Sequence, residues 1–318
     1  MSSTPVSINS KISHLIPVAP YPNWEQLLVD FLLTKPSEHT QRVYRTDIIN
    51  FLRDLDLSLG KFLTCDRYQA FELVSRYMGQ MSTKNLSPST INRRISAIKS
   101  LVTYAYNCGK CEYVLDNVKS LAIEPYRDTS GVSLAQFKQI LAAIDETSLK
   151  GKRDRAILLL LWGNALRRSE LAGCNIADFD PDSKTLRIKG KGRSQHEIVS
   201  LGTSARAAIQ YWLIARGEIN PTSALFCSVN PGYKDGRLCT QAIADIVISR
   251  SKAAGVNKKM SPHRIRHSSI TAALDATNGN VREVQKLSRH KNVQTLLVYD
   301  DNRTNAQAKV TNILDGLI

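Results

Sequence analysis

The sequence lacks any long apolar run, and no stretch of about 18 apolar residues occurs in its 318 residues. We therefore expect no membrane-spanning helix. Residues 1–21 also lack the charged region and long apolar stretch of a secretory signal, and their Ser/Pro-rich composition predicts a flexible segment. Internal repeats and low-complexity tracts are absent. A hydrophobic fraction of 42% is enough to bury a sizeable core.

Cysteine is scarce, with six residues in the chain. Only Cys108 and Cys111 form a CxxC pair, and no second pair or histidine follows at the spacing of a four-ligand zinc site. Thiols in a long basic chain usually stay reduced inside cells. We therefore expect neither a metal centre nor redox chemistry at this pair.

Acidic residues are also few, with 28 Asp+Glu against 43 Lys+Arg, so that the formal net charge is +15. Such an excess favours a polyanionic partner, because each phosphate neutralised by Lys or Arg releases counterions. A generically basic protein is the alternative. A membrane surface is less favoured, because the basic residues are spread along the chain. Nucleic acid is the partner that the charge predicts.

Residues 22–115 carry the periodicity of helices. Three apolar stripes at three- and four-residue spacing are formed by Leu27, Leu28, Phe31 and Leu32, by Tyr44, Ile48, Phe51, Leu52 and Leu55, and by Ile91, Ile95, Ile98, Val102 and Ala105. Ser37 can cap the second helix, and Ser87 or Ser89 can cap the last, with Pro88 in its first turn. A further helix fits residues 67–81. This region is predicted to be a small all-α bundle.

The polar side of the last helix of this bundle carries Arg93, Arg94 and Lys99. One interpretation is a solvated basic face, which many helices show. The other is a helix laid against DNA, with these side chains on phosphates. The sequence favours neither, and the three residues are candidates for DNA binding.

Residues 116–131 lack periodicity and contain Pro125 and Gly131, which predicts a linker. The pattern after Ser133 is mixed, and residues 132–318 are predicted to form a second, α-rich domain. Strands are expected at 185–189 and 197–201, joined by a Gly-Lys-Gly-Arg turn. Helices are expected at 137–144, 155–166, 204–215, 240–254, 262–275, 281–289 and 293–298.

Several polar residues of the second domain have the chemistry of a phosphate site. Arg167 stands where an apolar helix gives way to another, although an arginine there can simply complement helix carbonyls. His263 and Arg266 are i and i+3 in a helix that Ser261 can cap. That helix is either an anion site or a surface helix of mixed basic character.

His290 and Tyr299 flank a short helical stretch near the end of the chain. A tyrosine in such a place is usually a core or interface aromatic. Phosphoryl transfer to a protein hydroxyl, however, needs a nucleophile, cations for the non-bridging oxygens and a proton for the leaving oxygen. The second domain contains residue types suited to each of these tasks.

Taken together, these segments resemble the tyrosine recombinase (phage integrase) family, including its Xer-type members. The matching segments are ALRRSELAG, IKGKGRSQHEIVSL, SPHRIRHSS and LSRHKNVQTLLVY in the second domain, and SEHTQRVYRTDIINFL and LSPSTINRRISAIKSLVTYAYNCG in the first. They occur in the family's order and cover about residues 22–315. The resemblance implies a mainly α fold, with a SAM-like core-binding bundle and an α-rich catalytic domain with a small antiparallel sheet. The two would form a C-shaped clamp on DNA.

The resemblance also implies roles for individual residues. Tyr299 matches the nucleophile that forms a 3′-phosphotyrosine, and Arg167 and Arg266 match the arginines that grip the non-bridging oxygens. Lys191, on the hairpin turn, matches the general acid for the 5′-oxygen. His263 matches the group that assists removal of the tyrosine proton.

His290 matches a phosphate-binding or orienting residue. Glu170 matches an acidic residue that buttresses the site, although it is equally well explained as an ordinary helix carboxylate. The sequence departs from the family pattern at Ala165, where glycine is commoner, and at Ser288-Arg289, where Leu-Gly is typical. The remaining bases nearby, which include His267, are interpreted as phosphate contacts or surface residues.

The implied activity is site-specific DNA recombination through a Holliday junction, without ATP, metal or other cofactor. The implied partners are double-stranded target sites, further copies of the chain or of a paralogue in a tetramer, and accessory DNA-bending or directionality factors. The protein would act in the cytoplasm, on the nucleoid. Residues 305–318 show helical spacing, and the resemblance favours exchange of this helix with a neighbouring subunit over packing on its own domain.

Three other functions remain open at this stage. A DNA-relaxing topoisomerase uses the same tyrosine chemistry, but the two-domain plan favours a recombinase. A non-enzymatic DNA-binding protein could have lost any of the six catalytic groups, and all six are present. A structural chromosome-binding protein would form no covalent adduct with DNA.

Overall fold

The computed structural model describes residues 23–123, 131–190, 195–218, 220–290, 292–294, 296–297 and 306–317, the last segment with side chains from 311 onward. The chain divides into two compact units, Met1–Glu124 and Pro125–Ile318. The chain is mainly helical with one small antiparallel sheet, which confirms the predicted fold class. Each unit is described by itself.

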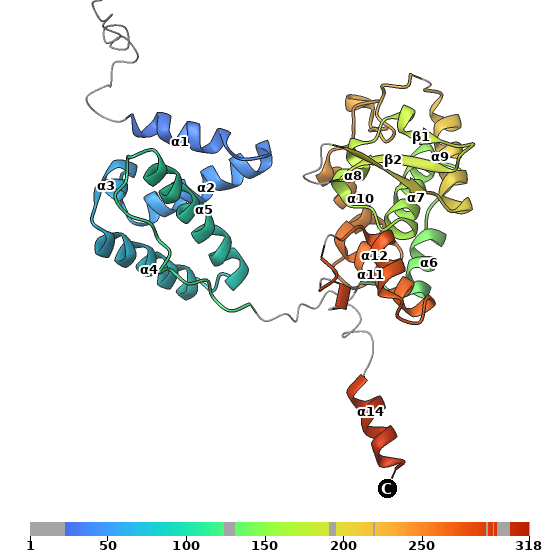
Figure 1. Cartoon of the computed structure of the whole chain (residues 1–318). Helices are drawn as coiled ribbons and strands as arrows, with labels where there is room; N and C mark the ends of the chain where they lie inside the picture. Colours follow the sequence, from blue (N-terminus) through green and yellow to red (C-terminus); the bar gives the residue numbers. More distant parts are fainter. Residues whose placement is uncertain are drawn as a thin grey trace, which may run out of the picture. The chain divides into compact units, whose positions relative to one another are not determined.

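The first unit is a bundle of helices (Figure 1). Its helices are α1 (Trp24–Leu33), α2 (Glu38–Asp54), α3 (Leu59–Thr64), α4 (Arg67–Thr83) and α5 (Pro88–Asn107). Ser37 and Ser87 accept hydrogen bonds from the N–H of the third residue of α2 and α5, and Pro88 opens α5, which confirms the predicted caps. Helix α5 packs on α1, α2 and α4 and is the centre of the bundle.

The core of the first unit is aromatic. The rings of Phe51, Phe62 and Tyr77 are fully buried and meet edge to face. Val118 is buried in the same core, and the Leu121 N–H donates to the side chain of Asn92 at 2.8 Å. The stretch that the sequence indicates as a linker therefore begins inside this packed unit.

The second unit contains a three-stranded antiparallel sheet of order β1-β2-β3. Its strands are β1 (Phe179–Asp180), β2 (Thr185–Lys189) and β3 (His196–Ser200). The register pairs Leu186 with Val199 and Lys189 with His196. The two predicted strands are confirmed, with β3 one residue earlier than expected. The short strand β1 was not predicted, because two residues carry no detectable alternation.

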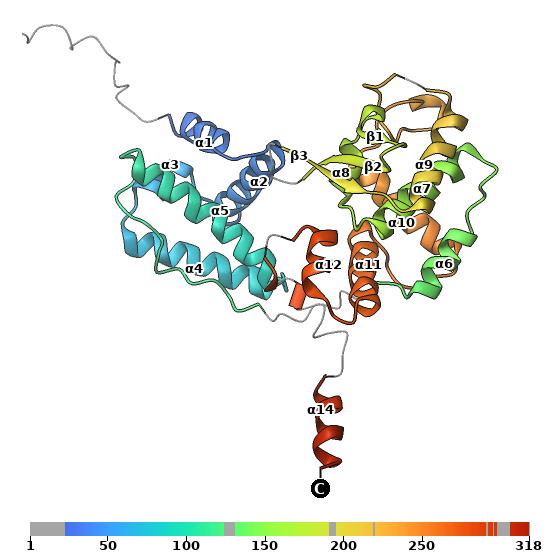
Figure 2. The same cartoon turned by 45° about the vertical axis from the view of Figure 1, so that its right-hand side comes forward.

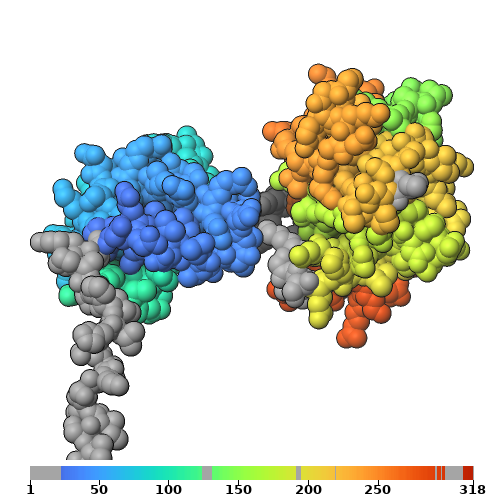
Figure 3. All heavy atoms as spheres, turned by 90° about the horizontal axis from the view of Figure 1, so that it is seen from above, coloured from blue at the N-terminus to red at the C-terminus, as the bar shows by residue number. Residues whose placement is uncertain are grey.

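The rest of the second unit is built of helices (Figures 1 and 2). They are α6 (Leu134–Ala142), α7 (Leu149–Gly163), α8 (Arg168–Gly173), α9 (Thr203–Arg216), α10 (Thr240–Ala253), α11 (Pro262–Ala276), α12 (Val281–Ser288) and α14 (Ala306–Asp315), with 3-10 turns at Ile176–Asp178 and Pro231–Tyr233. Helix α7 packs on α9 and α11, and α11 packs on α12. Seen from above, the surface of this unit is formed by yellow-green to orange residues of the sheet, α9 and the segment after it (Figure 3).

Helix α7 differs from the helix predicted at 155–166. It begins at Leu149, six residues before the predicted start, with Ser148 as its cap, and it ends at Gly163. The chain then turns, because Ala165 has a left-handed backbone with a φ of 45°. This turn, rather than a continued helix, leads into Arg167. Within the described ranges, no helix has the length and apolar character needed to cross a membrane.

Gly131 packs closely against α11 at the start of the second unit, and a substitution there tests this packing. A Cβ at this position would overlap the Ser268 hydroxyl and the Arg264 carbonyl of α11. We expect Gly131→Ala to destabilise this unit by about 1–3 kcal/mol through overpacking. This loss is measured by denaturant unfolding, monitored by tryptophan fluorescence. A Trp24→Phe background removes the tryptophan of the first unit, so that Trp162 and Trp212 report the unfolding of the second unit. The matched Gly163→Ala has no atom within 4 Å of its new Cβ. Equal stability of the two variants would contradict the prediction.

Candidate active site

Arg167 stands at the junction between α7 and α8. It is the residue that precedes α8, and its side chain is 30% exposed. Its backbone N–H donates to one carboxylate oxygen of Glu170 at 2.8 Å, and its guanidinium donates to the other at 2.7 Å. The carboxylate therefore caps the helix and aims the arginine at once.

Arg266 is presented by α11. Ser261 caps this helix by accepting from the Arg264 N–H, and Pro262 occupies its first position, as predicted. Although it is charged, Arg266 is only 1% exposed. Its guanidinium donates to the carbonyls of Ala165 and Ser288 and lies 3.3 Å from Nε2 of His290. Arg266 thus joins the turn before Arg167 to the end of α12.

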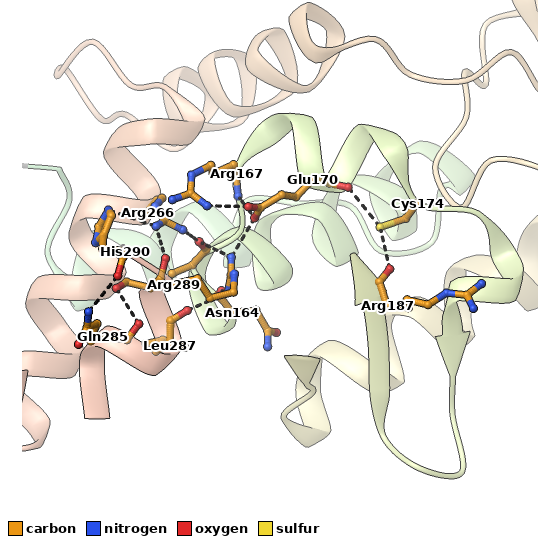
Figure 4. A network of polar contacts seen from close by, with 12 residues as sticks. Asn164, Arg167, Glu170, Cys174, Arg187, Arg266, Gln285, Leu287, Arg289 and His290 are labelled. Atoms are coloured by element: carbon orange, nitrogen blue, oxygen red, sulfur yellow. Dashed lines mark hydrogen bonds and ion pairs between the residues drawn. The ribbon is translucent and has the colours of Figure 1, made fainter. Parts of the chain in front are cut away.

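Arg289 lies in the same network, which Figure 4 shows. It follows α12 in a left-handed conformation with a φ of 56°, and its side chain is 4% exposed. One terminal nitrogen donates to the Asn164 carbonyl at 3.0 Å, and the other donates to Glu170 at 2.8 Å. The sequence indicated a charge near the site, and the structure shows that this charge points inward.

The charge state of Glu170 follows from these partners. Its burial alone would raise the carboxyl pKa. The positive charge of Arg289 and the hydrogen bonds from Arg167 outweigh burial, so that the pKa lies below its ordinary value. Glu170 is therefore a carboxylate at neutral pH. Its burial and its contacts with two arginines favour the buttress over an ordinary helix carboxylate, and its role in the site stays a prediction.

His290 extends the network from the end of α12. Burial, followed by the charges of Arg266, Arg167, His263 and Arg289, lowers its pKa to about 4. The imidazole is therefore neutral at neutral pH and can exchange hydrogen bonds without adding a charge. Gln285 donates to the His290 carbonyl at 3.0 Å, which helps to hold the ring in place.

His263 is exposed near the start of α11, and it pairs with His267 one turn later. Their Nε2 atoms are 2.7 Å apart and their rings are perpendicular. One of these nitrogens must donate and the other accept. Burial, and then the charge of His263, lowers the pKa of His267 to about 3. The interpretation of His267 as a surface residue was wrong, because it is buried and its ring meets that of His263; the alternative interpretation as a phosphate contact stays a prediction.

Of the candidate site residues, the structure brings together Arg167, Glu170, Arg266 and His290, with His263 close enough for its charge to act on His290; their roles stay predictions. A hollow of about 780 Å³ opens beside His290 and is lined also by Lys286, Arg289 and Leu297. The two remaining predicted residues, Lys191 and Tyr299, lie outside the described residues.

The three basic residues of α5 make contacts within the first unit. Arg93 forms an ion pair with the buried carboxylate of Asp47, and its side chain remains 44% exposed. Arg94 donates to the hydroxyl of Tyr77 at 3.2 Å, and Lys99 donates to the Val118 carbonyl at 3.0 Å. Each therefore has a structural task, and a contact with DNA remains a prediction.

The structure also bears on metal chemistry. In the part of the chain that is described, no three His, Cys, Asp or Glu side chains are grouped so that they could hold a metal ion. Cys108 is exposed, whereas Cys111 is buried and its thiol donates to the Tyr113 carbonyl at 3.4 Å. Burial raises the pKa of the Cys111 thiol, which disfavours the reactive thiolate.

Sequence reasoning missed Arg289 and His267 as site residues. The only signal for Arg289 was its place directly before His290, at a position where glycine is typical in the family that the sequence resembles. The signal for His267 was its spacing of four residues from His263, which places both on one helix face. Neither signal reveals burial, which decides what these side chains contact.

Comparison with family models divides the chain at a similar place. Residues 132–306 match the phage integrase family, and residues 25–109 match the N-terminal SAM-like domain of phage integrases. The first match covers more than half of the chain and contains every residue of the network described above.

Curated relatives and solved structures agree with these matches. A tyrosine recombinase of Synechocystis sp. is 46% identical over 92% of this chain and 96% of its own length. One of Synechococcus elongatus is 38% identical over 95% and 96%. The Tn1549 transposon integrase in complex with transposon DNA has the same fold, with a TM-score of 0.68, 18% identity and coverage of 91% and 98%. For the XerH recombinase bound to its substrate the TM-score is 0.66, at 18% identity and coverage of 86% and 80%.

His267, which is buried, and His290, which is half-buried, predict a pH dependence of stability. In the folded chain the pKa values of His267 and His290 are about 3 and 4, whereas an unfolded histidine titrates near 6.5. Below about pH 6.5 the unfolded chain therefore binds more protons, and the free energy of unfolding falls as the pH is lowered toward 4. Denaturant unfolding of the second unit between pH 7.5 and 5 measures this slope. His267→Gln should flatten it, and an unchanged slope in that variant would contradict the assignment.

Proposed function

Because the chain belongs to the phage integrase family and is a tyrosine recombinase, we propose that it exchanges DNA strands at specific sites through a phosphotyrosine on Tyr299. The observation that carries this proposal is the partly buried group formed by Arg167, Arg266 and His290. It gathers two guanidinium groups and a neutral imidazole from separate elements. Such a group of donors is suited to the non-bridging oxygens of a phosphodiester.

In the proposed reaction the hydroxyl of Tyr299 attacks phosphorus. A bond forms between its oxygen and phosphorus, and the bond from phosphorus to the 5′-oxygen breaks. His263, the exposed member of the histidine pair, assists removal of the tyrosine proton. Lys191 gives a proton to the departing 5′-oxygen. Arg167 and Arg266 stabilise the charge that develops on the non-bridging oxygens, and His290 donates a hydrogen bond to one of them.

The energetics of this exchange require no cofactor. One phosphodiester is exchanged for a phosphotyrosine ester of similar energy, so the reverse attack by a 5′-hydroxyl can rejoin either the original or a new strand. Two such exchanges on paired sites pass through a Holliday junction. Fixed arginines supply the electrostatic stabilisation that a metal ion provides in many nucleases.

The working partner is double-stranded DNA, and the net charge of +15 supports this choice. We place the reaction on the nucleoid, in a tetramer of identical or paralogous subunits with accessory DNA-bending or directionality factors. Helix α14 supports such an assembly. Its Ile313 and Leu314 are more than half exposed, and Leu317 beyond it is 77% exposed. A neighbouring subunit would cover this apolar face.

The covalent intermediate is the most direct test of this function. Wild-type protein and Tyr299→Phe are incubated with labelled genomic fragments in chelator, and adducts are trapped with detergent. We expect a detergent-stable adduct on a small set of fragments with the wild type only. The variant should lose the adduct completely while it retains DNA binding, because phenylalanine lacks the attacking oxygen.

The other outcomes point to other functions. Adducts spread evenly over all fragments would indicate a topoisomerase. Intact binding with no adduct, even on nicked substrates that prevent rejoining, would indicate a DNA-binding protein that does not cut.

Removal of residues 306–318 tests the exchange of α14. We expect the shortened chain to bind a single half-site with unchanged affinity but to lose the complex of paired sites, because assembly depends on the helix. Native gel shifts on half-sites and full sites measure both. A paired complex of normal stability from the shortened chain would place α14 outside the assembly.

A further inference from the structure

The guanidinium of Arg289 does not lie on the protein surface, and its contacts give it a task. Its terminal nitrogens donate to the carbonyls of Asn164, Ala165 and Leu287 and to the carboxylate of Glu170, at 2.8–3.3 Å. It therefore connects the end of α12 to the turn between α7 and α8 (Figure 4). Both segments carry residues of the proposed phosphate site.

The backbone of Arg289 is unfavourable for an arginine. Its φ of 56° lies in the left-handed region, which glycine adopts freely and which is strained for residues with a side chain. Its N–H closes α12 by donating to the Gln285 carbonyl at 2.7 Å, which a glycine would do without strain. A glycine would therefore suit this backbone position better, so we look for the role of Arg289 in the contacts of its side chain.

Two arginines of the proposed site share acceptors with Arg289. Glu170 accepts from Arg167 and from Arg289, and the Ala165 carbonyl accepts from Arg266 and from Arg289. If Arg289 is removed, the carboxylate loses its second cation and the carbonyl loses one of two donors. Arg167 can then shift, because Glu170 holds its guanidinium, whereas Arg266 keeps its bonds to the Ala165 and Ser288 carbonyls. A displacement of about 1 Å in a reacting group can cost about 100-fold in rate.

From these contacts we propose that Arg289 is a positioning residue of strand cleavage, which acts on the phosphate through Glu170 and Arg167 rather than by touching DNA. This inference rests on the proposed function. It adds a fourth charged member to the network and assigns it a role distinct from that of a phosphate ligand.

The chain contains a matched control for the loss of a buried arginine. Asp154 is a second buried carboxylate held between two arginines, Arg153 and Arg250. The side chain of Arg153 is 5% exposed, and it donates to Asp154 at 2.7–2.9 Å and to the Cys227 carbonyl at 3.1 Å. None of these acceptors belongs to the Glu170 network. Arg153→Met therefore breaks a similar ion pair in the same unit without touching the proposed site.

The test measures single-turnover adduct formation on nicked target DNA at saturating concentration, together with DNA affinity and unfolding. We expect Arg289→Met to lower the cleavage rate about 10- to 100-fold with little change in affinity, and Arg153→Met to change the rate by less than about twofold. Equal losses of rate in the two variants would show that Arg289 acts only through stability and would overturn the proposal.

A double-variant cycle tests whether Arg289 acts through Arg167. In an Arg167→Lys background, where the bidentate grip is already lost, Arg289→Met should add less than about threefold, because the two changes remove the same interaction. If Arg289→Met lowers the cleavage rate in that background as much as it does in the wild type, the proposed route through Arg167 is overturned.

If Arg289→Met does not fold, the cleavage rate of Arg289→Lys tests the proposal instead. A single ammonium cannot serve all four acceptors, so a loss of about tenfold is expected and an unchanged rate refutes the proposal.

The same experiment separates this inference from the function on which it rests. A wild-type protein that forms no adduct removes the proposed function, and the inference falls with it. A wild-type adduct with an unaffected Arg289→Met variant removes the inference alone.

Discussion

The buried carboxylate of Glu170 is the group on which the geometry of the site depends. A charge that is 1% exposed is stable only when it is paired, because the protein interior solvates it poorly. Arg167 and Arg289 supply the pairing, and the Arg167 N–H completes it. These partners come from the start of α8 and the end of α12. One buried charge therefore holds together two segments that are far apart in the sequence. Helix α11 joins them through Arg266, whose acceptors lie on the same two segments.

Local backbone strain makes this arrangement possible. Ala165 and Arg289 both have left-handed backbones, with φ of 45° and 56°. The turn at Ala165 ends α7 and presents the carbonyls of Asn164 and Ala165 toward the arginines instead of toward a further helical turn. Each left-handed residue costs roughly 1–2 kcal/mol, which hydrogen bonds to charged groups at about 1.5–3 kcal/mol each can offset. The site thus stores strain in the two turns that aim its cations.

Much of the fold could be predicted from the sequence, because periodicity and caps are local signals. Ser37, Ser87 and Ser261 cap the helices they were expected to cap, and the order of basic motifs indicated Arg167, Arg266 and His290. The failures have a common cause in burial and tertiary contact. The helix expected at 155–166 ends at Gly163 because the turn at Ala165 serves contacts from α11 and α12. The inward direction of Arg289 and the burial of His267 depend on the same packing, and no single-sequence pattern reports it.

The net charge of the network indicates which kind of ligand the proposed site favours. Arg167 and Arg289 bind the Glu170 carboxylate, and Arg266 binds the Ala165 carbonyl beside it, so these four side chains together carry a net positive charge of two. Their field, added to burial, keeps the pKa of His290 at about 4 and leaves that ring neutral. A further cation would only increase the repulsion, whereas a phosphodiester brings one negative charge and two oxygens that accept hydrogen bonds. The positive charge of these four side chains therefore favours an anion as the ligand of the proposed site. Because Glu170 already holds Arg167, and two backbone carbonyls already hold Arg266, the proposed reaction would need little reorganisation as charge grows on the phosphate oxygens.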